Sequence, residues 1–211
     1  MTGGPRLLAL VDAARYCVQR GVAGAFVECG VWRGGSVLAM ILTLQDEGDA
    51  VRDVYLYDTF EGMTTPTEHD VSRFDPPAME TWRAAQAEEQ RAWSELFDPR
   101  SFNEDAVRGL LEATGYPGDR LHLVRGPVEE TIPATVPESI ALLRLDTDWY
   151  ESTHHELVHL FPRLTNGAVL IIDDYGHWEG ARRAVDEYME ETGTHLLMVR
   201  IDYTGRIAVV N

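Results

Sequence analysis

The sequence predicts an α/β protein with a mostly parallel sheet and an antiparallel pair of strands at one edge. Short apolar segments alternate with segments of helical periodicity, as in chains whose crossovers return each strand parallel to the last. Two apolar segments, IALLRLD and AVLII, are almost uninterrupted, which is typical of strands covered on both faces. The chain ends in two apolar segments around DYTG, which together predict a hairpin.

The elements follow in regular order along the chain. An apolar stripe from Leu7 to Val18 has helical spacing, and the apolar run that follows it is broken by the glycine-rich segment GVWRGGS. Ser36 stands in the first turn of the next helix. Helices are expected over 7–18, 36–44, 104–113, 151–160 and 179–191, and strands over 25–29, 54–58, 121–124, 140–146, 168–172, 196–201 and 206–210.

Residues 61–102 form a segment too long for an ordinary connection. Its apolar residues suit one or two amphipathic helices, built from Met79, Trp82 and Ala85 and then from Trp93, Leu96 and Phe97. The segment rises from the carboxyl edge of the sheet, where open α/β sheets bind ligands, so we expect a helical lid over the site. The alternative is an extra packing layer or a subunit interface. We expect residues 1–211 to form a single domain with this insertion.

Composition and charge exclude several classes of function. The 211 residues include 18 basic and 35 acidic side chains, and the formal charge of −17 would repel nucleic acid and anionic membranes. No apolar run reaches the roughly 20 residues that span a bilayer, and the N-terminus lacks the pattern of a signal peptide. Cys17 and Cys29 show neither metal-ligand nor disulfide spacing. We therefore expect a protein of the reducing cytoplasm with no nucleic-acid or membrane partner.

A glycine-rich loop follows the first expected strand. Glu28 is followed by Gly30, Gly34 and Gly35, whose flexible backbone can bring a ligand close to the next helix. The spacing differs from the G-x-G-x-x-G of dinucleotide-binding proteins, and an acid here suits a cationic ligand group better than a pyrophosphate. The alternative is a tight turn with a solvated Glu28. Asp58 ends the second strand, where it can accept both hydroxyls of a ribose or else cap a turn; with the loop, we favour the ribose.

Four aspartates follow two later strands. Asp146 and Asp148 come after the fourth strand, and Asp173 and Asp174 after the fifth. If these strands are neighbours, about 4.8 Å apart, up to four carboxylates converge and raise each other's pKa, a conflict that Mg²⁺ or Ca²⁺ removes. The alternative is that Asp148 and Asp174 cap the following helices. A spare acid would serve as general base, and His177 is a second-choice base or else a loop histidine.

Seven segments together identify a family. In order they are VECGVWRGGS, YLYDTFEGM, RGPVEETIP, LRLDTDWYEST, FPRLTNGAVLIIDDYG, GARRAVDEY and IDYTG, spread from about residue 25 to 205. The sequence thereby resembles the macrocin-type O-methyltransferases, metal-dependent enzymes that use S-adenosylmethionine to methylate sugar hydroxyls in antibiotic biosynthesis. The resemblance implies a class I methyltransferase fold, Rossmann-like, with seven strands, an antiparallel last strand and helices on both faces.

The resemblance also implies roles for particular residues. It assigns the methionine end of the cofactor to Glu28, Gly30, Gly34, Gly35 and Ser36, the ribose to Asp58, the adenine to Val128 and Glu129, Mg²⁺ to Asp146, Asp173 and Asp174, and the base to Asp148. It further implies a small hydroxylated acceptor, such as a sugar or glycosylated natural product, and a homo-oligomer. The insertion matches the family poorly after Met63, so we expect it to determine acceptor specificity.

Two other functions compete with methyl transfer. Asp146-Thr147-Asp148 is also the D-x-D pattern with which some glycosyltransferases hold a metal and a nucleotide sugar. The glycine-rich loop and Asp58 favour the methyl donor instead. The other alternative is a methyltransferase-like binding module without turnover, and the presence of all four aspartates argues against it.

Overall fold

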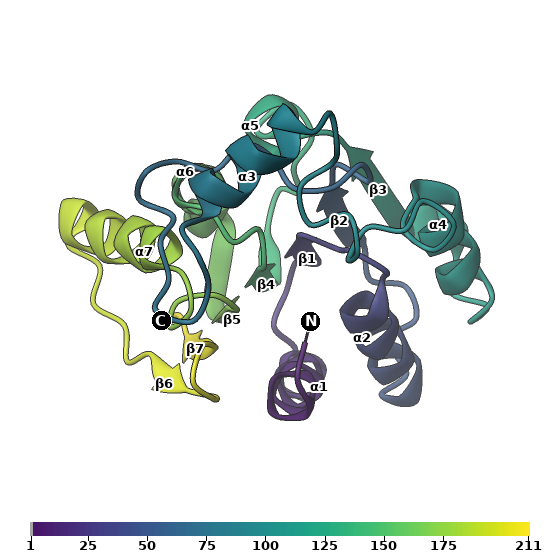
Figure 1. The fold of residues 1–211 in the computed structure, drawn as a ribbon. Helices are drawn as coiled ribbons and strands as arrows, with labels where there is room; N and C mark the ends of the chain where they lie inside the picture. Colours follow the sequence, from purple (N-terminus) through teal and green to yellow (C-terminus); the bar gives the residue numbers. More distant parts are fainter. Residues whose placement is uncertain (1) are drawn as a thin grey trace.

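Seven strands form one mixed sheet within residues 2–211, the part of the chain that this computed structural model describes (Figure 1). Their order is β3-β2-β1-β4-β5-β7-β6, and β7 runs antiparallel to both of its neighbours. The strands are β1 (Ala25–Cys29), β2 (Val54–Asp58), β3 (Leu121–Arg125), β4 (Ile140–Leu145), β5 (Leu164–Ile172), β6 (Val199–Arg200) and β7 (Arg206–Val209). The fold class predicted from the sequence, including its antiparallel last strand, is confirmed.

Helices cover both faces of the sheet (Figure 1). On one face lie α1 (Gly4–Gln19), α2 (Gly35–Asp46) and α4 (Glu104–Glu112), and on the other α5 (Val128–Thr131), α6 (Tyr150–Leu160) and α7 (Glu179–Thr192), with 3-10 turns over Gly118–Arg120 and Phe161–Arg163. Each face has its own apolar cluster, which explains why the central strands β1 and β4 are apolar almost throughout. In the described part of the chain, no helix combines the length and apolarity needed to cross a membrane.

Most expected elements form close to their predicted bounds, and the differences lie at their ends. The first helix begins at Gly4, and Leu7 is 38% exposed rather than part of its buried stripe. The terminal hairpin forms, but β6 is shorter than the expected strand over 196–201. Leu196 and Met198 pack against the apolar cluster while Leu197 is 84% exposed, but only Val199 and Arg200 pair with β7.

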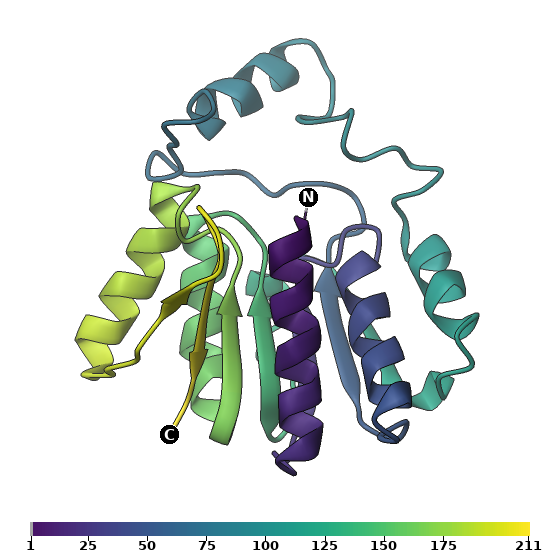
Figure 2. The same ribbon diagram turned by 90° about the horizontal axis from the view of Figure 1, so that it is seen from below.

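The insertion (residues 61–102) forms an arch over the carboxyl ends of the strands, as Figure 2 shows from below. It contains α3 (Ala78–Ala87), whose residues Met79 and Trp82 are half-buried as the amphipathic pattern predicted. The second amphipathic helix expected around Trp93 is wrong, because this stretch consists of turns. Trp93 has φ +51°, a left-handed conformation that a right-handed helix does not accommodate.

Asp70 fastens the insertion to the helices beneath it. Its fully buried carboxylate accepts hydrogen bonds through Oδ2 from the N–H and hydroxyl of Thr67, at 2.6 and 2.8 Å. Through Oδ1 it accepts the N–H of Tyr150, the first residue of α6, at 2.8 Å, so it acts as an N-terminal cap from outside the helix. Gly180 of α7 makes room for this contact, because a Cβ there would lie 1.9 Å from Oδ1.

The direction of strand addition reverses between β1 and β4. The chain continues from β1 to β2 and β3 on one side, and from β4 to β5 on the other, so the loops diverge and leave a crevice where such sheets bind ligands. The backbones of the two loops touch at Gly30, which has φ +83°. A Cβ at Gly30 would lie 2.0 Å from the carbonyl oxygen of Asp146, so only glycine fits.

Candidate active site

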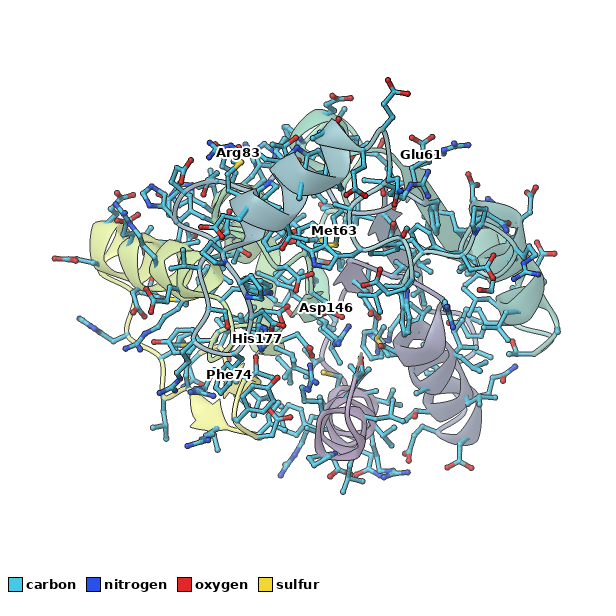
Figure 3. The ribbon with its side chains drawn as sticks, viewed as in Figure 1. Glu61, Met63, Phe74, Arg83, Asp146 and His177 are labelled. Carbon is cyan, nitrogen blue, oxygen red and sulfur yellow. The ribbon has the colours of Figure 1, made fainter. Side chains whose placement is uncertain are left out.

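A cavity of about 700 Å³ lies at this crevice, between the carboxyl ends of the strands and the insertion. Thr2, which precedes α1, and Arg6 in its first turn contribute to the lining, as does Tyr203 from the turn between β6 and β7. Figure 3 shows Asp146 and His177 near the middle of the view, close to Met63 of the insertion, and all three line the cavity. The volume lies in the range that accommodates a cofactor-sized ligand.

The glycine-rich loop forms one wall of the cavity. Gly30, Gly35 and Ser36 line it, as the sequence predicted for contacts to a cofactor. Gly34 lies behind this wall with φ +78°, against Val107 of α4, which a Cβ at Gly34 would approach to 3.2 Å. No side chain caps the first turn of α2 within the described residues, so its first backbone N–H groups are available to a ligand.

Glu28 lies behind the cavity wall rather than in it. Its side chain is fully buried, and Oε1 accepts a hydrogen bond of 2.5 Å from Nη1 of Arg144. Burial raises the pKa of Glu28 to about 7, against the opposing influence of Arg144. The structure therefore does not bring Glu28 to the ligand surface, and its influence there passes through neighbours such as Arg144 and Ser36.

Asp58 lines the cavity and at the same time holds the loops around it. Oδ2 accepts the backbone N–H groups of Val31 and Trp32 at 2.7 and 2.8 Å, and Oδ1 accepts that of Phe60 at 2.7 Å. Burial raises the pKa of Asp58, and these backbone hydrogen bonds act in the opposite direction. The ribose and turn-cap interpretations are thus compatible, since a carboxylate oxygen can accept more than one hydrogen bond.

Val128 and Glu129, the expected neighbours of the adenine, also line the cavity. They form the first turn of α5, beyond the carboxyl end of β3 and on the same side of the crevice as Asp58. Val128 is buried, whereas Glu129 is exposed. A flat apolar ligand group would therefore meet an aliphatic surface on this side of the cavity.

The predicted acid cluster forms on the other side of the crevice. Asp146, Asp173 and Asp174 each offer a carboxylate oxygen within 4.8 Å of the others. They meet because Leu145 and Ile172, the last residues of β4 and β5, are register partners. Burial and the carboxylates of Asp148 and Asp173 raise the pKa of Asp174, and its buried Oδ2 accepts no hydrogen bond from the described residues.

Two arginines missed at the sequence level partly neutralise this cluster. Arg144, only 1% exposed, donates to Glu28 and to Asp173 Oδ1 at 2.6 Å, and it lies 2.8 Å from Asp146 Oδ2. Arg6 contacts Asp173 Oδ2 from the first turns of α1. Despite burial, the two guanidinium groups lower the pKa of Asp173. A charged residue inside the apolar segment IALLRLD was the available signal, since a buried arginine requires anionic partners.

These contacts show how the cluster would hold a divalent cation. Both oxygens of Asp173 already face an arginine, whereas Asp174 keeps a buried oxygen without a partner in residues 2–211. Asp146 faces Arg144 through Oδ2 alone. Carboxylate oxygens are the ligands that Mg²⁺ and Ca²⁺ prefer, so the donor set fits such an ion, with Asp146 and Asp174 better placed to bind it than Asp173.

Asp148 lines the cavity next to the cluster, on the loop between β4 and α6. Its Oδ1 accepts a hydrogen bond of 3.0 Å from Nε1 of Trp178, and its backbone has φ +70°. Burial, together with the charge of Asp146, raises the pKa of Asp148 to about 7. Neither Asp148 nor Asp174 is the side-chain cap of the next helix, and the N–H of Tyr150 at the start of α6 goes to Asp70 instead.

His177 lines the cavity but has partners on both ring nitrogens. Nε2 lies 2.8 Å from Asp75 Oδ2, and Nδ1 lies 3.0 Å from the hydroxyl of Tyr203. Its ring also stacks on Phe74 at 5.4 Å, and Figure 3 shows these two side chains together. His177 therefore holds the insertion against the turn between β6 and β7, and this engagement favours Asp148 over His177 as the base.

A wall of three tryptophans completes the cavity, and the sequence had suggested only one of them, as part of the lid. Trp93 of the insertion packs on Trp149 at 5.4 Å, and Trp149 packs on Trp178 at 5.1 Å in a T-shaped pair. All three line the cavity beside Asp148. The signal available in the sequence was that Trp149 and Trp178 each follow the aspartates by a few residues.

Comparisons with known proteins agree with this architecture. The family described as macrocin-O-methyltransferase (TylF) matches residues 1–208. A tetracenomycin rhamnosyl 4'-O-methyltransferase from Streptomyces olivaceus is 35% identical over 92% of this chain and 70% of its own length. The mycinamicin III 3''-O-methyltransferase from Micromonospora griseorubida is 32% identical over 97% of this chain and 76% of its own length.

The fold has solved relatives as well. The structure of the O-methyltransferase NovP superposes with a TM-score of 0.83 and 25% identity, covering 99% of this chain and 81% of its own. The structure of the calicheamicin methyltransferase CalS11 superposes with a TM-score of 0.74 and 22% identity, over 96% of this chain and 77% of its own.

Proposed function

Since the chain belongs to the macrocin-O-methyltransferase family, we propose that it methylates a sugar hydroxyl of a glycosylated natural-product intermediate, with a divalent cation bound by its acid cluster. It is an O-methyltransferase that uses S-adenosylmethionine, as the sequence resemblance implied, which disfavours the glycosyltransferase interpretation. The sugar acceptor is inferred from the relatives, which are named for methylation of a rhamnosyl 4'-oxygen and of the mycinamicin III 3''-oxygen.

One observation carries the proposal. A single cavity contains a glycine-rich wall with Asp58 on one side and a carboxylate cluster with an unpartnered oxygen on the other. The first side offers hydrogen-bonding groups for the amino acid and ribose of a nucleoside cofactor. The second side offers negative charge where a cation and a hydroxylated acceptor would meet the transferred methyl group.

A metal ion would be held by Asp146 and Asp174, with Asp173 fixed beside them by its arginines. When bound, such an ion supplies Lewis-acid chemistry that lowers the pKa of a coordinated hydroxyl. The protein supplies the orientation of these carboxylates, because Arg144 ties β1, β4 and β5 together beneath them. Two arginines alone leave the cluster net negative, which is the physical reason for expecting a further cation.

The chain's own residues would carry the proton transfer and the exclusion of water. Asp148 lies at the cavity surface with a pKa raised to about 7, which suits a general base at neutral pH. The insertion arches over the cavity, so its closure on bound ligands would exclude water where the acceptor oxygen and the methyl donor meet. The three-tryptophan wall offers an apolar surface for the carbon face of a sugar ring or for an attached aglycone.

The proposal is tested by turnover on paired acceptors. The purified chain is incubated with S-adenosylmethionine, Mg²⁺ and a panel of rhamnosylated or related deoxysugar glycosides, each matched with its free aglycone, and products are followed by mass spectrometry. We expect methylation of the glycosides alone, loss of turnover after EDTA treatment, and recovery with added Mg²⁺. Methylation of the aglycones, or full activity in the chelated sample, would contradict the proposed acceptor or the proposed ion respectively.

A further inference from the structure

One directional contact fixes the carboxylate that we assign as the base. Nε1 of Trp178 donates to Oδ1 of Asp148 at 3.0 Å, whereas Oδ2 of Asp148 accepts no hydrogen bond from residues 2–211. The backbone of Asp148 has φ +70°, a strained conformation for a residue with a Cβ, so the fold holds this side chain in an uncommon place. The side-chain contact therefore engages one oxygen of Asp148 and leaves the other available.

Trp178 is itself held from several sides. It is 7% exposed, its backbone N–H donates to the carbonyl of Asp174 at 3.1 Å, and its ring makes T-shaped contacts with Trp149 and His177 at 5.1 and 5.0 Å. An indole confined in this way cannot turn its N–H away from Asp148 without disturbing its neighbours. The donor is thus fixed in advance of substrate binding.

From this geometry we infer that Trp178 is a positioning residue for methyl transfer. It holds Oδ1 of Asp148 and leaves Oδ2 directed to the acceptor hydroxyl. This inference depends on the proposed function, which assigns the base to Asp148. An indole suits the task because it donates one hydrogen bond, carries no charge and cannot bind a metal ion through that nitrogen, so it does not compete with a cation at the adjacent cluster.

The same wall contains a matched comparison residue. Trp149 is also buried, also packs in the wall, and also donates one hydrogen bond through Nε1, in this case to the carbonyl of Thr64 in the insertion at 3.0 Å. A phenylalanine at either position keeps an aromatic ring and removes one indole hydrogen bond. Trp178→Phe removes a hydrogen bond from the carboxylate of Asp148, whereas Trp149→Phe removes one from the backbone of the insertion.

The kinetic test compares Trp178→Phe with Trp149→Phe. We expect Trp178→Phe to lower kcat about 10- to 100-fold with the acceptor KM changed by less than about threefold, because the hydrogen bond that orients the base is lost while the aromatic ring beside the acceptor is kept. Trp149→Phe should instead act chiefly on the acceptor KM, through the insertion. Equal effects of both variants on kcat would overturn the positioning role.

A double variant shows whether Trp178 acts through Asp148. In the Asp148→Asn background, Trp178→Phe should lower the residual kcat by less than about twofold, since the group it orients no longer takes up a proton. If Trp178→Phe reduces kcat by the same factor in both backgrounds, Trp178 acts elsewhere and the inference is wrong, although Asp148 would remain the base. Full activity of Asp148→Asn itself would instead refute the proposed base.

A spectroscopic measurement tests the contact without turnover. The indole ¹H–¹⁵N resonance of Trp178, assigned by its disappearance in Trp178→Phe, should move upfield in Asp148→Ala, because the proton loses its carboxylate acceptor. The indole resonance of Trp149 provides the internal reference and should move much less. An unchanged Trp178 resonance in Asp148→Ala would show that the hydrogen bond is absent and would overturn the inference, whatever the kinetics of the enzyme.

Discussion

The carboxylates on the two sides of the crevice differ in their hydrogen-bonding partners. On the β2 side, the carboxylate of Asp58 accepts three backbone N–H groups, so its charge is spread over the loops that it holds. On the β4 and β5 side, Asp146 and Asp174 face other carboxylates, the nearby arginines contact Asp146 and Asp173, and one oxygen of Asp174 has no partner in the described residues. The carboxylate on the β2 side therefore has its hydrogen-bond donors within the protein, whereas the cluster on the β4 and β5 side has an oxygen without one in the described residues.

The difference indicates what each side can bind. A carboxylate fixed by backbone donors is rigid and can accept neutral hydroxyl groups at its remaining lone pairs with little rearrangement. A cluster with several buried carboxylates and an unpartnered oxygen is stabilised when a cation or a proton neutralises it. The cofactor side is therefore held in place by the protein alone, whereas we propose that a bound cation completes the acid cluster.

The strongest test of this contrast is Asp174→Asn. The substitution keeps the size of the side chain but removes the charge that the unpartnered oxygen carries, so we expect kcat to fall about 1,000-fold. Affinity for S-adenosylhomocysteine should change less than about threefold, because the cofactor side is left intact. Turnover is measured by mass spectrometry and affinity by calorimetry. The control is Asp119→Asn, because the side chain of Asp119 is 80% exposed and does not line the cavity.

A second test removes charge on the opposite side, by Asp58→Asn. The amide keeps one acceptor oxygen and places an NH₂ group against at least one of the three backbone donors, so the loops around the cofactor lose a fixed contact. We expect the Kd for S-adenosylhomocysteine to rise about 10- to 100-fold, while kcat at saturating cofactor falls much less than in Asp174→Asn. The same effect on kcat in both variants would remove the distinction between the two sides.

Both sides were located from the sequence, because each rests on residues that end apolar strands. Parallel strands bring their carboxyl ends to one edge, so Asp58, Asp146 and Asp173 were expected there before their contacts were known. The resemblance to a family further implied that the last strand of the sheet is antiparallel. The sequence did not indicate which groups donate hydrogen bonds to each carboxylate or form ion pairs with it.

The missed residues share a physical reason. Arg144, Trp178 and Asp70 act through contacts with residues far away in the sequence, at separations of 116 for Arg144 with Glu28, 30 for Trp178 with Asp148, and 80 for Asp70 with Tyr150. Local periodicity and strand-end position carry no information about such pairs. The expected helix around Trp93 failed for a related reason, since its apolar residues face neighbouring parts of the cavity wall rather than one helical stripe.

A smaller effect is expected where the insertion meets the acid side. Phe74 stacks on His177 at 5.4 Å and contacts Tyr203 edge-on at 5.2 Å, so Phe74→Ala weakens closure over the acceptor. Aromatic pairs of this kind contribute about 0.5–1.5 kcal/mol, so the acceptor KM should rise about 3- to 10-fold. The Kd for S-adenosylhomocysteine, measured by calorimetry, should stay unchanged. An equal loss of cofactor affinity would show that this contact closes both sides of the crevice together.

The smallest effect on turnover is expected at Glu156, a buried acid beneath the cluster that contacts no arginine within residues 2–211. Glu156 is fully buried, its Oε1 accepts the hydroxyl of Thr147 at 3.0 Å, and burial raises its pKa well above the ordinary value, so it holds its proton to higher pH in the folded state than in the unfolded chain. In the unfolded chain Glu156 ionises above about pH 4.3, so the folded state binds more protons and loses stability as pH rises from there toward the folded pKa. Glu156→Gln removes this loss, because an amide cannot ionise.

We therefore expect the stability advantage of Glu156→Gln over the wild type to grow by about 1.4 kcal/mol per pH unit from about pH 4.3 up to the folded pKa, with the two chains equal near pH 4.5. Urea unfolding near pH 4.5 and at pH 7.5 measures the difference, and Glu151→Gln, at an exposed position on the same helix, is the control. If the two chains differed in stability by the same amount at both pH values, Glu156 would be ionised in the folded state, like the carboxylates of the cluster. In that case the group of carboxylates without enough positive charge would include Glu156, below Thr147, and a bound cation would have to offset its charge as well.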